Sequence, residues 1–173
     1  MTDNKFSIFE QLSKEIRNRK RKDKPFVIGV TGIDTSGKTR FAGALSEFLI
    51  SNGHKTQLIH LDDFHNPRSI RYSGQDQAEN YYQKSFDIAT IIQKLLIPIR
   101  SNGKLSTELT LLNLTTDKYE VNKKYSVDES TIVVFDGVFL FRNELSKYID
   151  YKIFLEIPLE ESKNRAVARD VPI

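Results

Sequence analysis

Short apolar runs alternate with segments of helical spacing along most of the chain. The runs typical of buried strands are FVIGV (26–30), TQLIHL (56–61), TIVVFDGVFL (131–140) and YKIFLEI (151–157). Helical spacing appears at 41–49, at 87–99 (where Pro98 is expected to close the helix), at 142–149, and at 159–170, opened by Pro158. Strands that alternate with helices predict an α/β fold, a parallel sheet with helices on both faces.

Two regions fall outside this alternation. The stretch 65–77 is polar and has no strong period, whereas 108–127 carries β-prone stretches around polar turns, as in a small hairpin. The sequence shows no internal repeat and no clear linker. The whole chain, 1–173, is therefore expected to form one domain.

The net charge of +3 is modest but unevenly placed. In the basic N-terminal helix expected within 1–24, seven of the eleven residues from 14 to 24 are basic. Such a patch could contact nucleic acid or an acidic membrane. However, Phe9, Leu12 and Ile16 recur at helical spacing, which favours an amphipathic helix docked on the domain with a solvated basic face. Nucleic acid is therefore not the expected partner.

Composition excludes several classes of protein. The chain has no cysteine, so it has neither disulfides nor thiolate metal sites. No apolar run approaches the roughly 20 residues that cross a bilayer, and the start MTDNKFSIFEQ lacks the layout of a secretory signal. We expect a cytoplasmic protein without a membrane partner.

The sequence GIDTSGKT (32–39) fits G-x-x-x-x-G-K-[ST] at every fixed position, between a predicted strand and a predicted helix. In such a phosphate-binding loop (P-loop), backbone N–H groups and the helix N-terminus bind phosphate oxygens. Lys38 would reach the outer phosphates, facing solvent until a nucleotide binds, and Thr39 would bind Mg²⁺. The residues expected to hold the nucleotide are Gly32, Asp34, Thr35, Ser36, Gly37, Lys38 and Thr39.

Acidic residues follow two other predicted strands, at the sheet edge where ligands of such folds bind. Asp62 and Asp63 end the second strand, and at most one of them is expected to face a substrate, because neighbours on an extended segment point to opposite sides. That carboxylate could accept the proton of an attacking hydroxyl. Asp136 ends IVVFD, the position from which an acid supports Mg²⁺.

Other polar residues could join this edge. Arg165 and Arg169 lie four apart on one face of the last predicted helix, where they could neutralise a moving phosphoryl group. His60 and His65 flank the two acids, but no paired spacing supports zinc. His65 is interpreted as a polar group on the substrate side.

Taken in order, five stretches resemble the uridine kinase family, within the larger phosphoribulokinase and pantothenate kinase group. They are GIDTSGKT, HLDDFH (60–65), YYQKSFD (81–87), FDGVFLFRNEL (135–145) and IFLEIPLEESKNRAVARD (153–170). The resemblance spans 26–170. The loop alone is generic, but the ordered set is specific.

The resemblance implies roles for individual residues. Asp62 would be the general base, and Asp136, one methylene shorter than the family's glutamate, would contact Mg²⁺ through water. Arg165 and Arg169 would begin the lid over the phosphates of ATP. The residues expected on the acceptor side are Asp63, His65, Tyr81, Tyr82 and Arg169.

The chain also departs from the family pattern. Tyr81 stands where uridine kinases have an acid for the ribose hydroxyls, and Leu112-Asn113 replaces an expected Tyr-Asp pair. The chain ends at Ile173, where the rest of the lid would follow, so the lid after 170 is expected to be missing or the site to close differently.

These observations predict an ATP- and Mg²⁺-dependent kinase that transfers the γ-phosphoryl group to a hydroxyl of a small molecule, a nucleoside by resemblance. The alternatives are a nucleotide hydrolase and a nucleic-acid-binding P-loop protein that uses its basic N-terminal helix. Asn122-Lys123-Lys124-Tyr125 does not supply the base-reading motif of a GTPase. The sequence leaves open whether the protein forms a homo-oligomer.

Overall fold

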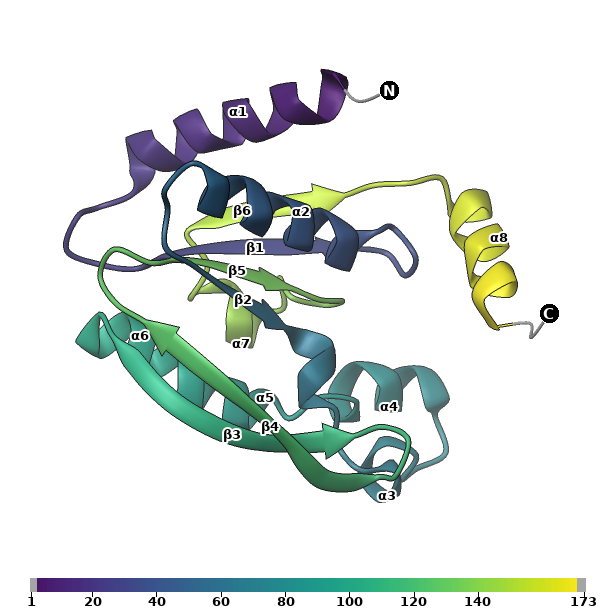
Figure 1. The fold of residues 1–173 in the computed structure, drawn as a ribbon. Helices are drawn as coiled ribbons and strands as arrows, with labels where there is room; N and C mark the ends of the chain where they lie inside the picture. Colours follow the sequence, from purple (N-terminus) through teal and green to yellow (C-terminus); the bar gives the residue numbers. More distant parts are fainter. Residues whose placement is uncertain (1–2, 171–173) are drawn as a thin grey trace.

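The computed structural model describes residues 3–170, with side chains for 8–168. Its central sheet has four parallel strands in the order β2-β5-β1-β6 (Figure 1). The strands are β1 (Phe26–Gly32), β2 (Thr56–His60), β5 (Ile132–Asp136) and β6 (Tyr151–Leu155). Because all four run the same way, their carboxyl ends share one edge, as expected for a P-loop fold. The predicted α/β class is confirmed.

The strands send alternate side chains to opposite faces of the sheet. Val27, Val133 and Phe135 join the larger apolar cluster, whereas Ile28 and Val134 join the smaller one. This alternation, with both faces buried, explains why β1 and β5 are almost continuously apolar.

Helices cover both faces of the sheet. The smaller cluster lies under α1 (Asp3–Arg19) and α2 (Lys38–Ser51), and the larger one under η2 (Ile91–Leu96), α6 (Ile97–Asn102) and α7 (Asn143–Ser146). The remaining helices are η1 (Leu61–Phe64), α3 (Arg68–Arg71), α4 (Gln77–Lys84), α5 (Ile88–Thr90) and α8 (Leu159–Asp170). Phe9 of α1 packs on Phe41 and Phe48 of α2, with ring centroids 5.4 and 5.6 Å apart. The docked amphipathic helix predicted from the sequence is confirmed.

The helix expected to end at Pro98 continues past it. Residues 91–96 form a π-helix, and α6 carries Pro98 in its first turn and ends before Gly103, which has a φ of 66°. In the π-turn the N–H of Ile97 bonds to the carbonyl of Ile92, five residues back. Proline lacks an N–H and is tolerated at the first turn of a helix. The prediction that the helix ends at Pro98 was therefore wrong. The π-helix leads directly into α6, and Pro98 lies in the first turn of α6, where proline is tolerated.

The predicted hairpin is present and longer than expected. Strands β3 (Leu105–Asn113) and β4 (Lys118–Val127) are antiparallel and form their own sheet. The N–H of Ser126 donates to Oε1 of Gln57 in β2 at 2.9 Å. The hairpin thus lies beside the β2 edge of the central sheet.

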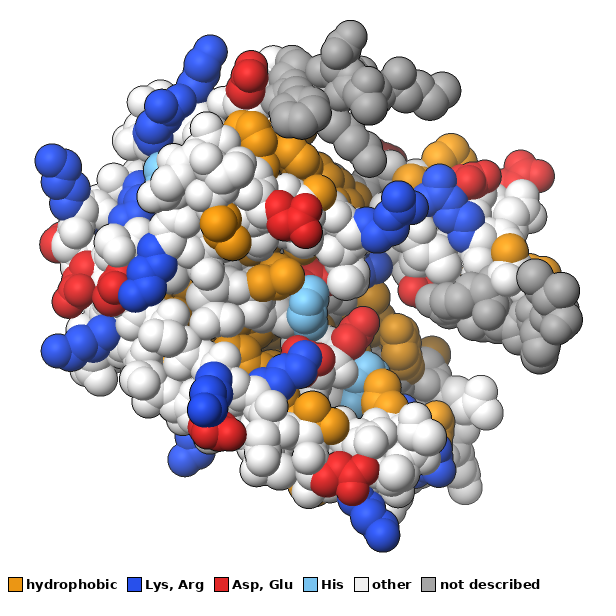
Figure 2. Space-filling view, viewed as in Figure 1, with side chains coloured by type: hydrophobic (Ala, Val, Ile, Leu, Met, Phe, Trp, Pro, Cys, Tyr) orange, Lys and Arg blue, Asp and Glu red, His pale blue; other side chains and the backbone are white. Residues whose placement is uncertain are grey.

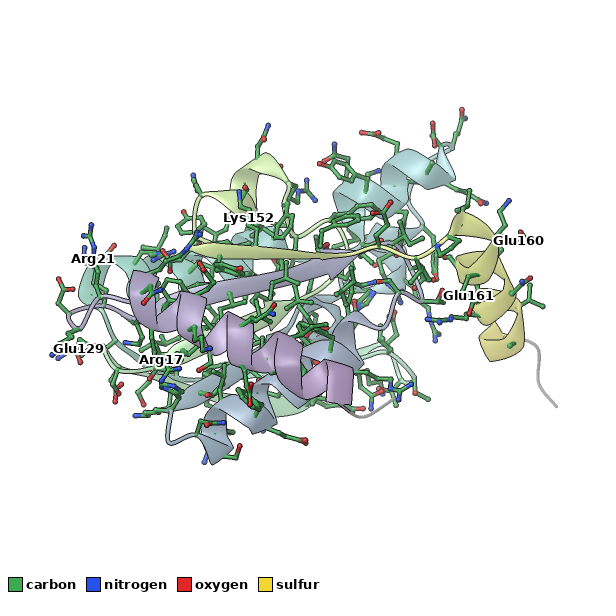
Figure 3. All side chains as sticks on the ribbon, turned by 90° about the horizontal axis from the view of Figure 1, so that it is seen from above. Arg17, Arg21, Glu129, Lys152, Glu160 and Glu161 are labelled. Atoms are coloured by element: carbon green, nitrogen blue, oxygen red, sulfur yellow. The ribbon has the colours of Figure 1, made fainter. Side chains whose placement is uncertain are left out.

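The basic segment lies at the end of the sheet opposite to the P-loop. Arg17 and Arg21 lie near Glu129 in Figure 3, whereas Glu160 and Glu161 of α8 lie at the far end of the view. Because α1 leads directly into the start of β1, its basic end meets the amino ends of the strands (Figure 1). No helix in the described residues has both the length and the apolar character needed to span a membrane.

Candidate functional site

The P-loop connects β1 to α2 through two left-handed residues. Thr35 has a φ of 58° and Gly37 a φ of 87°. Gly32 is constrained by space instead, since a Cβ there would lie 2.3 Å from the carbonyl oxygen of Leu155 and 2.7 Å from Oγ of Ser36. The glycines of the motif therefore meet two different needs, a left-handed turn at one and close packing against β6 at the other.

Lys38 lies folded into the loop. Its residue is 9% exposed, and Nζ donates to the carbonyl oxygen of Ile33 at 2.8 Å. The expectation that Lys38 faces solvent was therefore wrong, because a carbonyl of the loop supplies a hydrogen-bond acceptor for its ammonium group. Reaching a phosphate would require that hydrogen bond to be exchanged.

Helix α8 is fastened to the P-loop through Ser162. Oγ of Ser162 donates to the carbonyl oxygen of Asp34 at 2.9 Å, and Oγ1 of Thr35 donates to the carbonyl oxygen of Ser162 at 3.0 Å. Arg165 donates to Glu161 at 2.7 Å and to the carbonyl oxygen of Thr35 at 3.3 Å. The structure thus brings Arg165 to the loop. The side chain of Arg169, like the lid expected after 170, lies outside what the structure describes.

Asp136 joins the P-loop to β2. Its Oδ2 accepts from Oγ1 of Thr39 at 2.9 Å, and its Oδ1 lies 2.5 Å from Nδ1 of His60. The carboxyl group is nearly buried, and this hydrogen bond is the main reason why the pKa of His60 is raised. A hydroxyl beside a carboxylate suits Mg²⁺, a hard cation that takes few protein ligands together with phosphates and water. No cluster of three or more His, Cys, Asp or Glu able to hold a metal occurs among the described residues.

The two acids after β2 lie in the short 3-10 helix η1 rather than on an extended strand. Asp63 forms an ion pair with Lys123 of β4, Oδ2 to Nζ at 2.7 Å, and so faces the hairpin. Asp62 is exposed, and its carbonyl oxygen lies 2.6 Å from Nδ1 of His65. The tight helix separates the two carboxylates, although by a different geometry from the one expected.

The pKa of the Asp62 carboxyl group is raised, and several other polar groups of the site contribute to its value. Protein atoms around the carboxyl group reduce its hydration, and this is the largest cause of its raised pKa. The negative charge of Asp136 raises the pKa further, whereas His65, Lys38 and His60 lower it. A carboxylate with a raised pKa is a stronger base, as general-base catalysis requires.

Gly137 joins the strand ends behind these acids. Its N–H donates to the carbonyl oxygen of Val30 at 3.1 Å, and its own carbonyl accepts from Oγ1 of Thr31 at 2.7 Å. A Cβ at this position would lie 2.3 Å from Cβ of Leu61, the residue before Asp62. Only glycine allows β5 and η1 to pack this closely.

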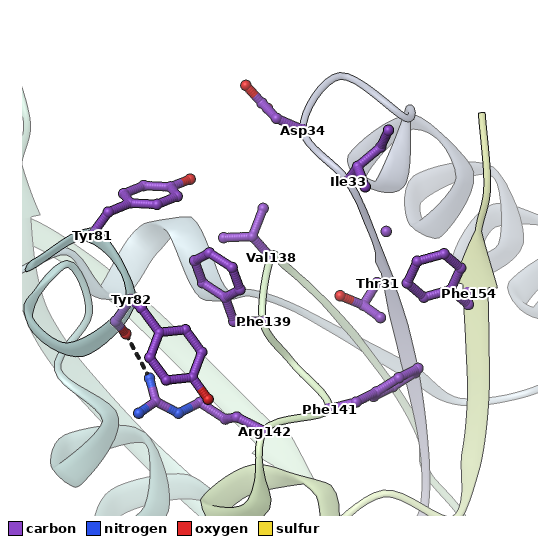
Figure 4. A pocket seen from close by; sticks show the side chains of 11 residues that line it. Thr31, Ile33, Asp34, Tyr81, Tyr82, Val138, Phe139, Phe141, Arg142 and Phe154 are labelled. Carbon is purple, nitrogen blue, oxygen red and sulfur yellow. Dashed lines mark hydrogen bonds between the residues drawn. The ribbon is translucent and has the colours of Figure 1, made fainter. Parts of the chain in front are cut away.

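An aromatic cavity of about 530 Å³ opens beside the start of the P-loop (Figure 4). The rings of Tyr81 and Tyr82 meet Phe139 edge-on, with centroids 5.3 and 5.1 Å apart. Arg142 holds this wall, because its Nη1 donates to the carbonyl oxygen of Tyr82 at 2.9 Å while its guanidinium lies over the Tyr82 ring. The lining is Thr31, Gly32, Ile33, Asp34, Tyr81, Tyr82, Val138, Phe139, Phe141, Arg142 and Phe154.

A second, polar cavity of about 420 Å³ lies between η1, α3 and α4. His65 and Tyr81, both predicted from the sequence to face the acceptor, line it, and Tyr81 is shared with the aromatic cavity. Figure 2 shows histidine and acidic side chains together beside the hollow between α8 and the α3–α4 region. Asp62, the P-loop and both cavities therefore share one edge of the molecule.

Sequence reasoning missed four polar side chains at this edge. Ser162 and Arg142 lie in stretches that resemble the uridine kinase family but were given no role, because they act through contacts with segments far apart in the chain. Arg71 belonged to none of these stretches. His60 was considered only as a zinc ligand. Its position one residue before Leu61-Asp62, on the strand next to β5, is the signal that could have paired it with Asp136.

No family model matches the chain. In sequence it is 27% identical over 150 residues to the uridine kinase of Limosilactobacillus reuteri (strain DSM 20016) and 27% identical over 155 residues to that of Ligilactobacillus salivarius. These matches cover 86% and 87% of this chain, and 66% and 69% of the relatives. The chain thus spans about two thirds of the length of these curated relatives.

Solved structures agree with the fold. A possible uridine kinase from Bacillus stearothermophilus superposes with a TM-score of 0.72 at 24% identity, covering 92% of this chain and 90% of that one. The D-glycerate 3-kinase of Cryptococcus neoformans has a TM-score of 0.53 at 16% identity, covering 77% of this chain and 52% of that one. The chain is therefore similar in sequence to uridine kinases, and it shares its fold with the possible uridine kinase from Bacillus stearothermophilus.

Proposed function

We propose that this chain is a kinase that transfers the γ-phosphoryl group of ATP to a hydroxyl group of a small molecule. The observation that carries the proposal is that the carboxyl ends of the neighbouring strands β1, β5 and β2 bring the P-loop, Asp136 and Asp62 to one edge of the sheet, where Asp136 accepts a hydrogen bond from Thr39 of the loop at 2.9 Å. One end of this arrangement suits phosphate and the other suits a proton acceptor.

On the donor side, the loop Gly32–Thr39 would bind the phosphates through its backbone N–H groups, with Lys38 exchanging the carbonyl of Ile33 for a phosphate oxygen. Thr39 and Asp136 would hold Mg²⁺, which when bound would neutralise charge on the phosphates. A third cavity, of about 570 Å³, borders Ser36, Gly37 and Arg165, and is our candidate for the nucleotide base.

On the acceptor side, Asp62 would take the proton. The acceptor oxygen forms a bond to the γ-phosphorus, the bond between that phosphorus and the bridging oxygen breaks, and ADP leaves. The hydroxyl proton passes to the carboxylate of Asp62, whose raised pKa suits this role. Arg165, held beside Thr35, would offset charge on the moving group.

The acceptor would lie between Asp62 and Tyr81. A nucleoside is the acceptor class that the relatives' names suggest, and the aromatic wall could stack a base. Tyr81 differs from the carboxylate that the family uses for ribose hydroxyls, so we expect uridine itself to be used poorly.

The deciding experiment measures ADP formation from ATP with and without a panel of nucleosides, sugars and vitamins, together with mass analysis of the products. ADP formation that depends on an acceptor and yields a phosphorylated product supports a kinase. Acceptor-independent release of inorganic phosphate would show a hydrolase instead. Salt-sensitive binding of RNA or DNA without any turnover would favour the nucleic-acid alternative.

A further inference from the structure

The polar cavity contains a largely buried arginine whose hydrogen bonding is incomplete. The side chain of Arg71 is 13% exposed. Its Nε is buried and has no hydrogen-bond partner within the described part of the chain. The nearest carboxylate oxygen, Oδ1 of Asp117, lies 4.0 Å from Nη2, and the guanidinium lies 5.2 Å from the ring centroid of Tyr72. A buried charge with such weak pairing is costly unless a ligand completes it.

Asp117 is engaged elsewhere. Its two carboxylate oxygens accept from the backbone N–H of Arg68 at 3.0 and 3.3 Å. The residue sits in the turn of the β3–β4 hairpin with a φ of 57°, so its backbone is fixed by that turn. Asp117 therefore stabilises the start of α3 and does not form a close, two-pronged pair with Arg71.

Arg142 shows what a fully engaged arginine looks like in the same protein. Its side chain is 5% exposed, and it donates to Glu144, to the carbonyl oxygen of Tyr82 and to Gln83. The N–H groups of Arg142 donate to protein acceptors, whereas Nε of Arg71 has no acceptor in the described part of the chain. The two arginines are similarly buried, so burial alone does not explain the open positions of Arg71.

The rest of the polar cavity suits a small polar anion. Side chains that can form hydrogen bonds line it, namely Asn80, Gln75, Gln77, Ser85, Tyr72, Tyr81 and His65. No acidic residue occurs among the described residues of this lining. Since His65 also contacts the carbonyl oxygen of Asp62, the cavity begins next to the proposed base.

We propose that the acceptor, unlike the nucleoside that the relatives' names suggest, carries an anionic oxygen group, a carboxylate or a phosphate, which the guanidinium of Arg71 binds in the polar cavity. Arginine presents paired N–H donors that match the two oxygens of such a group. The acceptor hydroxyl then points out of the cavity toward Asp62. The placement of the acceptor hydroxyl beside Asp62 rests on the proposed kinase function, but binding at the anion subsite can be measured without turnover.

The test compares matched probes that differ in one anionic group: glycerate with glycerol, and ribose 5-phosphate with ribose. Binding is titrated calorimetrically with the P-loop saturated by ADP, so that the loop cannot act as the anion site. The wild type is compared with Arg71→Gln, which removes the charge, and with Arg71→Lys, which keeps the charge but not the fork. Arg68→Gln is the matched control, since Arg68 also lies on α3 but donates to the carbonyls of Leu114 and Thr115 in the hairpin turn.

We expect the wild type and Arg68→Gln to bind at least one anionic probe about 10- to 100-fold more tightly than its neutral partner, the range for charge-assisted hydrogen bonds. Arg71→Gln should lose this preference and Arg71→Lys should keep part of it. The glycerate and ribose 5-phosphate pairs distinguish a carboxylate from a phosphate. A wild type without anion preference under ADP, or an Arg71→Gln variant that keeps it, overturns the inference.

Turnover separates this inference from the proposed function. If anionic probes bind through Arg71 but no probe and no compound of the wider panel is phosphorylated, the subsite stands and the kinase proposal fails. If only neutral compounds are phosphorylated and Arg71→Gln leaves their kcat/KM unchanged, the kinase proposal stands and the anion subsite fails.

Discussion

The proposed phosphate-donor side and the proposed acceptor side of this site use different kinds of chemical group. The donor side consists mainly of backbone, in the loop Gly32–Thr39, and its key side chains already have protein partners: Lys38 at Ile33 and Thr39 at Asp136. The acceptor side consists of side chains from η1, α3 and α4, among which Arg71 retains a buried donor without an acceptor in the described structure. The proposed phosphate site therefore follows a general sequence motif, whereas the proposed acceptor site depends on side chains particular to this chain.

The largest effect is expected from substitution of Asp62, the proposed general base on the acceptor side. Asp62→Asn keeps the size of the side chain but cannot take a proton, so kcat should fall by roughly two to four orders of magnitude. ATP affinity should change little. Asp63→Asn is the matched control and should have a milder effect, because Asp63 is paired with Lys123.

Turnover and ATP affinity of both variants provide the measurement. If Asp63→Asn is inactive while Asp62→Asn is nearly normal, the assignment of the base is off by one residue. If neither matters, transfer relies on positioning alone.

The second prediction breaks the donor side. Lys38→Ala should lower kcat/KM by about 10²- to 10³-fold, the usual loss when a donor to developing charge is removed. Since Lys38 is buried against Ile33, its removal also deletes a loop hydrogen bond, and Lys38→Met is included to keep part of the packing. Circular dichroism and thermal unfolding should show that both variants are folded, with Lys94→Ala, an exposed lysine of η2, as the control. Normal activity in a folded Lys38 variant would contradict the kinase proposal.

The third prediction tests which acceptor the site prefers. Uridine should have a lower kcat/KM than the best compound of a broad screen, because Tyr81 cannot accept two ribose hydrogen bonds as a carboxylate can. Tyr81→Asp should raise the kcat/KM for uridine by about tenfold, the value of one charge-assisted hydrogen bond. The same change at Tyr119, an exposed tyrosine of β4, should have no such effect. Efficient uridine turnover by the wild type would show that this departure matters little.

The fourth and smallest effect concerns pH. Asp62 acts as a base only when deprotonated, and its pKa lies above its ordinary value. The kcat/KM should therefore fall about tenfold per pH unit below that raised pKa, and this acidic limb should vanish in Asp62→Asn. A raised carboxyl pKa in the folded state also means that ionisation of Asp62 opposes folding, so stability is lost as pH rises through the folded pKa.

Thermal unfolding near neutral pH measures this second consequence. Asp62→Asn should unfold at a slightly higher temperature than the wild type, by less than the 2–4 °C that about 1 kcal/mol produces in a domain of this size. A lower unfolding temperature would contradict the raised pKa of Asp62.

The sequence predicted well the sheet and the position of the P-loop motif between a strand and a helix. Apolar strands, helical spacing and the P-loop motif are local signals, and the order of motifs indicated the fold class. The end of the helix at Pro98 was misjudged because a π-turn depends on packing around it. The folded position of Lys38 was misjudged because it depends on a carbonyl of its own loop.

The acceptor side was less predictable for a physical reason. The contacts of His60 with Asp136 and of Lys123 with Asp63 join segments far apart in sequence. No local pattern specifies them. The roles of Asp62, Asp63, His65, Tyr81 and Tyr82 remain predictions that the variants above will test.

The close packing at Gly137 has a consequence for motion in this protein. Because Leu61 is buried and a Cβ at residue 137 would lie 2.3 Å from its Cβ, we expect the start of η1 to stay packed against the end of β5. This packing should limit changes in the distance between Asp62, the proposed base, and Asp136, the proposed support for Mg²⁺. A larger residue at position 137 would push Leu61, and with it Asp62, away from the end of β5.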